Sequence, residues 1–282
     1  MACRNKKGCY SRRIREKMTV FHYPGLYLCF ISQHLKKIFE YRLSFFIGII
    51  PFILLQLSAI VVIWVIFKKV PHIAGFSFDE VLFVYGLGIV CYAFGRMVFS
   101  NLNNFGYRYI IKGELDAILT KPINPLFHIL ATDFSEKEIG ELFVGIILII
   151  KSIIGLKIHF GILELLALLY FLLNGIIIYG SINLIAVIIC FWTKDIQGLT
   201  SPIMRIQEFS QYPVTIYGKA IRFVITWIIP FAFISFFPAV FFIRKEEFIG
   251  YIICIPLIGI IFPLIAYLLW LKGLSRYESS GT

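Results

Sequence analysis

The side chains that could do chemistry are few in this sequence, and their spacing matches no familiar catalytic or metal-binding pattern. No G-x-x-x-x-G-K-S/T loop is present to cradle the phosphates of a nucleotide. The five histidines form no HExxH motif and have no paired carboxylates beside them. The six cysteines include no CxxC pair, so neither a zinc site nor a disulfide framework is indicated. We therefore predict no catalytic residue, no metal site and no cofactor bound by this chain.

Residues 112–126 form the most informative polar stretch, because they predict a short helix with apolar and acidic residues on opposite faces. The apolar set is Leu115, Ile118 and Leu119, and the acidic set is Glu114 and Asp116. Pro122 and Pro125 end the helix, since the residue before a proline is pushed out of the helical region. Such a helix suits docking into a groove on another protein. A helix lying on the lipid surface would have the same composition, and that alternative stays open.

Three charged residues fall inside or near apolar segments, where an unpaired charge is costly. An antiparallel hairpin with its turn near residues 157–158 would place Lys151 opposite Glu164, so we predict an intramembrane ion pair. Contact of these two residues with a substrate is the alternative. Arg96 lies one turn from the inner end of a predicted span, so its side chain can reach the headgroups. A functional role for Arg96 is the alternative there.

The composition indicates what must position these residues. Hydrophobic residues make up 59% of the chain and charged residues only 15%, far from the balance of a soluble protein. Several apolar runs approach the length of about 20 residues that a helix needs to cross the hydrocarbon core. Because backbone groups in lipid must be satisfied within the segment, these runs should be helices. We predict an all-α integral membrane protein.

The positive charge is concentrated at the amino-terminal end. The formal net charge is +11, and ten of the 27 Lys and Arg residues precede residue 44. Cytoplasmic flanks of membrane proteins carry such an excess, and basic segments are attracted to anionic headgroups. The distribution therefore indicates a cytoplasmic amino terminus and membrane lipids as neighbours, and it argues against nucleic-acid binding.

Six transmembrane helices are predicted within residues 44–272, with both termini cytoplasmic. The spans lie at about 44–67, 80–100, 139–156, 162–192, 194–217 and 248–271, with a cytoplasmic coupling loop at 101–138. A basic tail (1–22) and an interfacial amphipathic helix (23–43) come before them, and a solvated cytoplasmic helix is the alternative for the latter. Two Ser-x-x-Glu sequences, at Ser77 and Ser135, have the form of capping boxes that begin the second and third spans.

The fifth span is ambiguous. Residues 220–243 are strongly apolar, but Pro230 and Pro238 break or kink helices, whereas residues 194–217 are only moderately apolar. Hydropathy alone selects 220–243 as the fifth span. A second solution places the span at 194–217 and makes 220–243 a broken, re-entrant element at the outer face. Both solutions give six crossings.

Three groups of residues carry a resemblance to a known family. They are Glu40-Tyr41-Arg42, the block Gly113-Glu114-Leu115-Asp116…Lys121-Pro122…Asn124-Pro125, and Gln207-Glu208-Phe209…Tyr212-Pro213 followed by Ile229-Pro230-Phe231-Ala232. With these features the chain resembles the permease subunits of bacterial ATP-binding-cassette (ABC) exporters of the type-2 (drug and polysaccharide exporter) class. Within that class it is similar to a six-span branch usually encoded as two related permeases beside one ATPase. The resemblance covers about residues 25–272.

The resemblance implies a subunit that dimerises with itself or with a sibling permease above a cytoplasmic ABC ATPase, which binds ATP and Mg²⁺. Residues 113–119 would form the coupling helix that the ATPase contacts. The implied coupling residues are Gly113, Glu114, Leu115, Asp116, Ile118, Leu119, Lys121, Pro122, Asn124 and Pro125. The resemblance also implies that residues 220–243 are the outer re-entrant element, which favours the second topology.

From these inferences we expect a permease in the bacterial cell (cytoplasmic) membrane that exports an amphiphilic or hydrophobic substrate, such as a lipid, drug or peptide. The direction of transport follows from the resemblance, and the sequence identifies no substrate-binding residue. A membrane scaffold or sensor subunit that binds an ATPase without transporting anything is one alternative. A membrane enzyme acting on lipid-linked substrates is the other.

Overall fold

The computed structural model describes residues 22–40, 42–193, 200–244 and 248–278. Within these residues every element is helical, apart from one isolated bridge between Ile73 and Phe76. The long helices are α2 (His22–Glu40), α3 (Arg42–Lys69), α4 (Phe78–Phe99), α7 (Ile139–Gly155), α8 (Ile162–Ile188) and α13 (Ile249–Arg276). The shorter segments are η1 (Ser100–Asn104), η2 (Gly106–Ile111), α5 (Glu114–Leu119), α6 (Pro125–Thr132), α9 (Cys190–Thr193), α10 (Thr200–Phe209), η3 (Val214–Ile216), α11 (Lys219–Phe223), η4 (Val224–Ile228), η5 (Phe231–Phe233) and α12 (Phe236–Ile243). The predicted all-α class is confirmed for this part of the chain.

Four helical stretches among the described residues are long and apolar enough to cross a membrane. They are Phe45–Lys69, Phe78–Ile111, Ile162–Thr193 and Ile249–Arg276. Helix α7 is apolar too, but its 17 residues are at the short limit for a crossing helix. The chain is therefore a multi-pass membrane protein, and the count of six spans stays a prediction.

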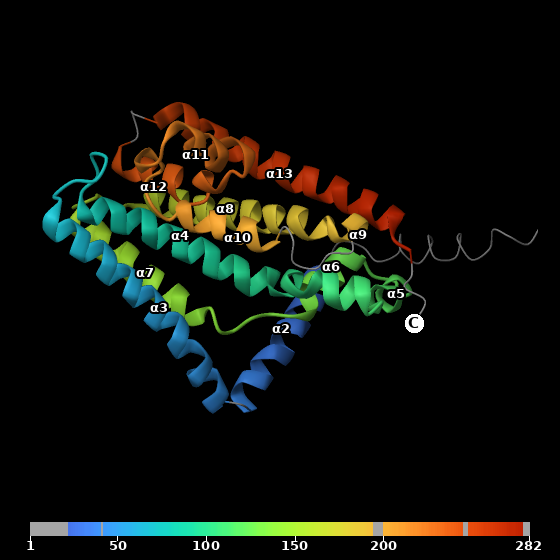
Figure 1. The fold of residues 1–282 in the computed structure, drawn as a ribbon. Helices are drawn as coiled ribbons and strands as arrows, with labels where there is room; N and C mark the ends of the chain where they lie inside the picture. The colour runs from blue at the N-terminus through green and yellow to red at the C-terminus, as the bar shows by residue number, and fades with distance from the viewer. Residues whose placement is uncertain (1–21, 41, 194–199, 245–247, 279–282) are drawn as a thin grey trace, which may run out of the picture.

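Helix α4 is the centre of the bundle. The apolar window of its stretch is 83% buried, whereas the windows of α3 and α13 are only 11% and 17% buried. Helix α4 packs against α7 and α8, and more lightly against α12 and α3. Figure 1 shows it running through the middle of the molecule. The apolar faces of α3 and α13 are thus the ones that lipid or another subunit would cover.

Glycine residues allow α4 and α7 to approach each other closely. A Cβ atom at Gly145 would lie 2.8 Å from Cγ2 of Val90, and one at Gly86 would lie 3.1 Å from Cβ of Leu148. Small residues at helix contacts in membranes bring the backbones together and increase van der Waals packing. The α4–α7 contact is therefore a fixed part of the bundle.

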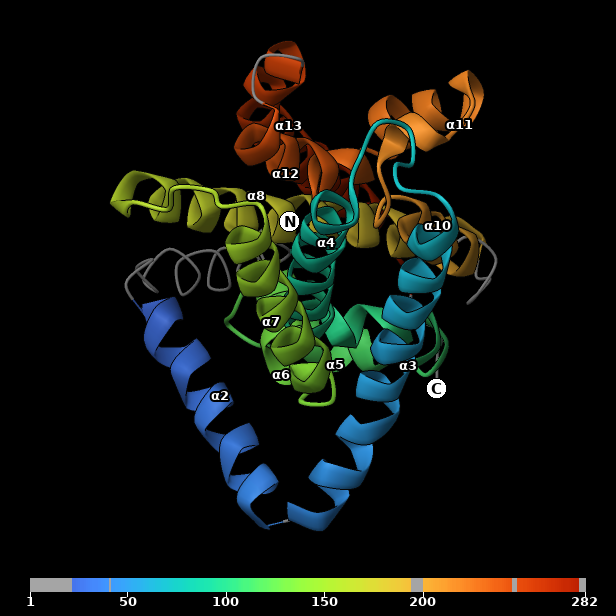
Figure 2. The same ribbon diagram turned by 90° about the vertical axis from the view of Figure 1, so that its left-hand side faces the viewer.

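The predicted packing of the third and fourth spans as an antiparallel hairpin is wrong. Helix α7 packs on α4 and α3, whereas α8 packs on α4 and α13. Figure 2 shows α7 and α8 running in different directions from the turn that joins them. Because each helix buries its inner face against α4, the two diverge beyond residues 156–161 and do not lie side by side.

The structure breaks both candidate fifth spans. Residues 194–199 lie outside the described residues, and α10 ends at Phe209, before a turn and η3. Residues 219–243 form a broken helix whose backbone leaves the helical region at Ile229 (φ −123°, ψ 87°) and turns back at Pro230. The solution that makes 220–243 one continuous crossing helix therefore does not hold. Entry of this segment into the membrane from the outer face stays a prediction.

The two predicted capping boxes have different outcomes. The Ser77 backbone N–H donates to the Glu80 carboxylate at 2.7 Å, so the first box is confirmed as the start of α4. The second box is wrong, because α7 begins after Glu138 without a side-chain cap. The Ser135 N–H instead donates to the carbonyl of Met97 at 3.2 Å, which holds the end of the coupling loop against α4.

Helix α2 diverges from the bundle and forms a V with α3 (Figures 1 and 2). It contacts α6, where the rings of Tyr27 and Phe127 lie 6.5 Å apart. His34 Nε2 also lies 3.0 Å from the carbonyl oxygen of Thr132. The predicted helix at 23–43 is therefore present but belongs to two elements, α2 and the start of α3. Its position relative to lipid stays a prediction, and most of the basic tail lies outside the described residues.

Candidate functional site

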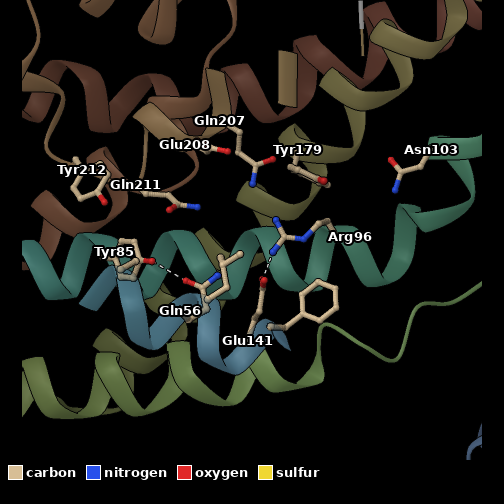
Figure 3. Close-up of a pocket in the computed structure, with 13 residues that line it drawn as sticks. Gln56, Tyr85, Arg96, Asn103, Glu141, Tyr179, Gln207, Glu208, Gln211 and Tyr212 are labelled. Atoms are coloured by element: carbon tan, nitrogen blue, oxygen red, sulfur yellow. Dashed lines mark hydrogen bonds and ion pairs between the residues drawn. The ribbon is translucent and has the colours of Figure 1, made fainter. Parts of the chain in front are cut away.

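A polar cavity of about 630 Å³ lies within the otherwise apolar bundle, among α3, α4, α7, α8 and α10 (Figure 3). Its apolar lining is Phe52, Leu55 and Ala59, and its polar lining is Gln56, Tyr85, Arg96, Asn103, Glu141, Tyr179, Gln207, Glu208, Gln211 and Tyr212. Polar groups inside a membrane domain are costly unless they are paired or hydrated, so such a cluster indicates a functional site.

An ion pair between Arg96 of α4 and Glu141 of α7 forms one wall of the cavity (Figure 3). The Glu141 side chain is only 4% exposed, whereas that of Arg96 is 24% exposed. The pair joins the two helices that the glycine contact brings together. Arg96 therefore faces an acid inside the bundle, and the interpretation that it reaches the headgroups is wrong.

A second polar contact joins α3 to α4. The hydroxyl of Tyr85 donates to Oε1 of Gln56 at 2.7 Å (Figure 3). Both residues are buried, with Gln56 4% and Tyr85 2% exposed. Because α3 is otherwise mostly exposed, this hydrogen bond is a specific link between α3 and the core of the bundle.

A chain of hydroxyl groups connects α4 to the end of α10 and to the broken helix. Ser210 Oγ donates to the carbonyl of Gln207 at 2.7 Å, so the hydroxyl of Tyr92 is the donor in its hydrogen bond with Ser210 Oγ. Ser235 Oγ donates to the carbonyl of Ser210 at 2.5 Å. These contacts hold the Gln207–Gln211 side of the cavity against α4 and against residues 219–243.

One acid of the cavity lining, the exposed Glu208 of α10, has no cation beside it in the ion pairs of the described residues. Arg96 and Glu141 neutralise each other. The rings of Tyr85 and Tyr212 line the same cavity, with centroids 6.0 Å apart. The arrangement can hold a ligand through charge and aromatic faces, and within the described residues no cluster of His, Cys, Asp or Glu could hold a metal ion.

Two short helices of the coupling loop, α5 and α6, lie at one end of the molecule (Figure 1). Gly113 comes directly before α5 with φ 68°, a left-handed conformation that favours glycine. Asn124 caps α6, since its Oδ1 accepts hydrogen bonds from the N–H groups of Leu126 and Phe127 at 2.9 and 3.3 Å. Pro125 occupies the first turn of α6, where the missing N–H costs nothing. The Asn-Pro pair thus starts α6.

The apolar face of α5 is covered by the chain itself. Leu115 is fully buried and Ile118 is 5% exposed. They belong to a cluster that includes Phe105, Phe191 and Trp270, whose rings are mutually 5.5–5.7 Å apart. Leu115 and Ile118 therefore cannot be direct contacts for a partner. The exposed positions in and beside α5 are Ile111, Lys112, Ala117, Thr120, Lys121 and Pro122.

The acidic residues of α5 also have partners within the chain. Glu114 accepts a hydrogen bond from Arg108 Nε at 2.5 Å, which ties α5 to η2. Burial, and then the negative charge of Asp116, raises the pKa of Tyr277, so Asp116 lies beside the end of α13. Lys121 Nζ is 2.9 Å from Nε2 of His128, and burial together with that cation lowers the pKa of His128.

The structure does not bring Lys151 and Glu164 together. Lys151 Nζ lies 5.3 Å from the centroid of the Phe78 ring, and a Glu164 oxygen accepts a hydrogen bond from the Gly161 N–H at 2.9 Å. The two residues are absent from the ion pairs of the described part of the chain. The predicted pair depended on an α7–α8 hairpin, which the position of α4 prevents.

Sequence reasoning missed the cavity. Gln56 was a visible signal, since it is an amide in the middle of a long apolar span. Arg96 and Glu141 were visible as well, but they lie 45 residues apart and only the α4–α7 contact makes them neighbours. Gln207 and Glu208 belong to a motif that carries the family resemblance, but the sequence alone does not assign them to a site.

Apolar helices around a polar cavity, with a short helical loop at one end, define a multi-pass membrane protein with the parts of a transport subunit. A family model described as ABC-2 family transporter protein matches residues 34–281. The chain belongs to this family, whose members are the membrane permeases of ABC transporters and work with an ATPase partner. Comparisons with curated proteins and with solved structures gave no match.

Proposed function

We propose that this permease exports an amphiphilic substrate through the polar cavity, driven by an ABC ATPase that docks at α5 and α6. One observation carries the proposal. The continuous helical stretch Phe78–Ile111 holds Tyr85 and Arg96 in the cavity and Arg108 beside Glu114 of the coupling helix. A displacement of α5 therefore acts on the same rod that forms the cavity wall.

The aromatic cluster under α5 supports this route for force. Leu115 and Ile118 belong to the same buried cluster as Phe105, which lies between η1 and η2 in the same rod, and Trp270 of α13. Protein interiors are close-packed, so such a contact transmits a shift instead of absorbing it. η2 is π-helical, a form that often marks functional segments. The face that would receive the ATPase is then Ala117, Thr120 and Lys121.

The cavity supports an amphiphilic substrate with a cationic or strongly polar end. Glu208 supplies a negative charge, and Tyr85 and Tyr212 supply ring faces that attract cations. The volume of about 630 Å³ is within the range of sites for drug-sized ligands, about 300–1,000 Å³. Export, as opposed to import, is proposed from the family resemblance.

The remaining parts of the proposal concern assembly. The permease would lie in the bacterial cell membrane with both termini inside, as six spans with residues 219–243 re-entrant at the outer face. The exposed face of α3 would pair with a second copy or with a sibling permease, which would close the cavity that Gln56 lines. ATP and Mg²⁺ would be bound by the ATPase partner.

The test is co-purification and transport with the partner ATPase. Ala117→Arg places a bulky charge on the exposed face of α5 without touching its buried face. We expect loss of ATPase co-purification and of ATP-driven uptake of rhodamine 6G, a cationic amphiphile, into inside-out vesicles. The matched control is Ala220→Arg, which makes the same change on an exposed helix at the opposite end of the molecule and should leave both unchanged.

A second arm separates transport from scaffolding. Glu208→Gln removes the charge of this acid from the cavity lining and should lower uptake while ATPase binding persists. Glu136→Gln, an acid outside the cavity lining, is its control. Unchanged ATPase binding in Ala117→Arg would refute the docking face. ATPase binding and hydrolysis without flux of any cationic, zwitterionic or anionic amphiphile would favour the scaffold alternative.

A further inference from the structure

A second, smaller pocket of about 190 Å³ lies between the broken helix and α13. It is lined by Lys219, Arg222, Phe223, Thr226, Trp227 and Tyr251. α11 and α12 lie at the end of the molecule away from α5 and α6 (Figure 1). The pocket shares no residue with the polar cavity and has no part in the function proposed above.

The polar residues of this pocket share one helical face. Lys219, Arg222 and Thr226 have the i, i+3, i+7 spacing that aligns side chains along a helix. Neither cation takes part in the ion pairs found among the described residues. Two positive charges thus face a pocket with no acid among its described lining residues, which favours an anionic ligand.

The Thr226 hydroxyl gives independent evidence for a ligand. Thr226 is 3% exposed, and its buried Oγ1 has no hydrogen-bond partner among the residues that the structure describes. Buried hydroxyls in proteins normally have a partner, because leaving one unpaired costs free energy. An acceptor atom seated in the pocket would satisfy this donor, and the oxygens of a phosphate are strong acceptors.

The aromatic walls indicate which molecule carries that phosphate. Trp227 and Phe223 are 49% and 57% exposed. Tyr251 is fixed from behind by stacking on Phe237, with ring centroids 4.5 Å apart. Exposed aromatic side chains beside basic residues are typical of the interface between headgroups and acyl chains. A volume of about 190 Å³ is below the range for drug-sized ligands but suits a headgroup.

We propose that this pocket binds the phosphate of a net-anionic lipid headgroup. Lys219 and Arg222 donate to the phosphate oxygens, and the Thr226 hydroxyl donates to one of them. The acyl chains lie along Phe223 and Trp227 at the surface. A bound lipid would thereby hold the broken helix to α13.

The experiment titrates phosphatidylglycerol onto the delipidated full-length protein and counts bound lipid by native mass spectrometry. Lys219→Gln/Arg222→Gln should weaken the saturable binding event about thirtyfold, since each Lys or Arg near an anionic lipid contributes about fivefold. Thr226→Val keeps the shape, removes the hydroxyl and should weaken binding about tenfold. The matched control is Lys68→Gln/Lys69→Gln, which removes two exposed cations near the end of α3 and should change binding less than about twofold.

Two further arms identify the ligand and the place. Inorganic phosphate at millimolar concentration should not displace the lipid, and equal potency of phosphate would overturn the lipid assignment. Equal binding by the Lys219/Arg222 variant and by the Lys68/Lys69 control would overturn the site. If Lys219→Gln/Arg222→Gln does not fold, the test is the quenching of tryptophan fluorescence by brominated phosphatidylglycerol. The fraction of the fluorescence that is quenched should fall in Trp227→Phe, and an unchanged fraction would refute the proposal.

Discussion

The Arg96–Glu141 ion pair predicts an asymmetric response to the loss of either partner. Arg96→Gln leaves the Glu141 carboxylate, with a side chain only 4% exposed, as a buried charge without its cation. Removing one partner of a buried pair costs about 3–5 kcal/mol, or about two to four orders of magnitude in the folding equilibrium. Glu141→Gln leaves Arg96, which is 24% exposed and faces the cavity, so water can solvate it. We expect its cost to be about half as large.

The double variant Arg96→Gln/Glu141→Gln tests whether the two residues act as a pair. Two amides can hydrogen-bond across the same α4–α7 contact, so we expect the double variant to be more stable than Arg96→Gln alone. The measurement is reversible unfolding in mixed micelles for the wild type, both single variants and the double variant. The paired arrangement is refuted if the two single variants lose equal free energy of unfolding and the double variant loses the sum of the two losses. That result would mean that the two residues are not an unequally buried pair.

The same set of variants separates stability from transport. The double variant restores packing but removes both charges from the cavity wall. It should therefore reach the membrane in normal amounts and still move rhodamine 6G more slowly than the wild type. Wild-type flux in a stable double variant would show that the ion pair serves the fold alone.

Three further changes test other parts of the structure. Tyr85→Phe leaves the buried Gln56 amide without its donor and should destabilise the fold by about 1–3 kcal/mol, which Gln56→Leu in the same chain should partly reverse in unfolding measurements. Gly145→Ala brings a Cβ atom within 2.8 Å of a side chain of α4 and should cost about 1–3 kcal/mol, while Gly250→Ala, which meets nothing within 4 Å, should not destabilise. Asn124→Ala removes the cap of α6, and we expect a loss of about 1 kcal/mol, seen as faster hydrogen exchange in residues 125–132.

Apolar composition and periodicity were enough to predict most of the crossing helices. A run such as 44–67 must satisfy its own backbone in lipid, so its helical state follows from length and hydropathy alone. The observed helix extends from Arg42 to Lys69, two residues beyond the prediction at each end. The short helix at 114–119 and its end before Pro122 were predictable for the same kind of reason, since they depend on local backbone rules, whereas Pro125 was expected to end that helix and instead begins α6.

Which helix packs on which could not be predicted in this way. In lipid the apolar faces of α7 and α8 are equally compatible with each other and with α4. The shapes of the helix surfaces decide which helices pack together. Gly86 and Gly145 allow α4 and α7 to approach closely, and hydropathy does not reveal this contact. The wrong hairpin then led directly to the wrong pairing of Lys151 with Glu164. The correct pair, Arg96 with Glu141, needed the α4–α7 contact first.

The proposed coupling helix, α5, shows a related limit of sequence reasoning. An amphipathic sequence predicts that one face is covered, but not by which chain. In α5 the apolar face, with Leu115 and Ile118, is covered by the protein's own aromatic cluster. In the proposed docking, the ATPase would therefore act on the opposite face, at residues such as Ala117 and Lys121, and would push α5 toward Phe105 and Trp270. If α5 is the coupling helix, as proposed, a push on its exposed face would pass to α4 and α13, which border the polar cavity and the smaller pocket respectively.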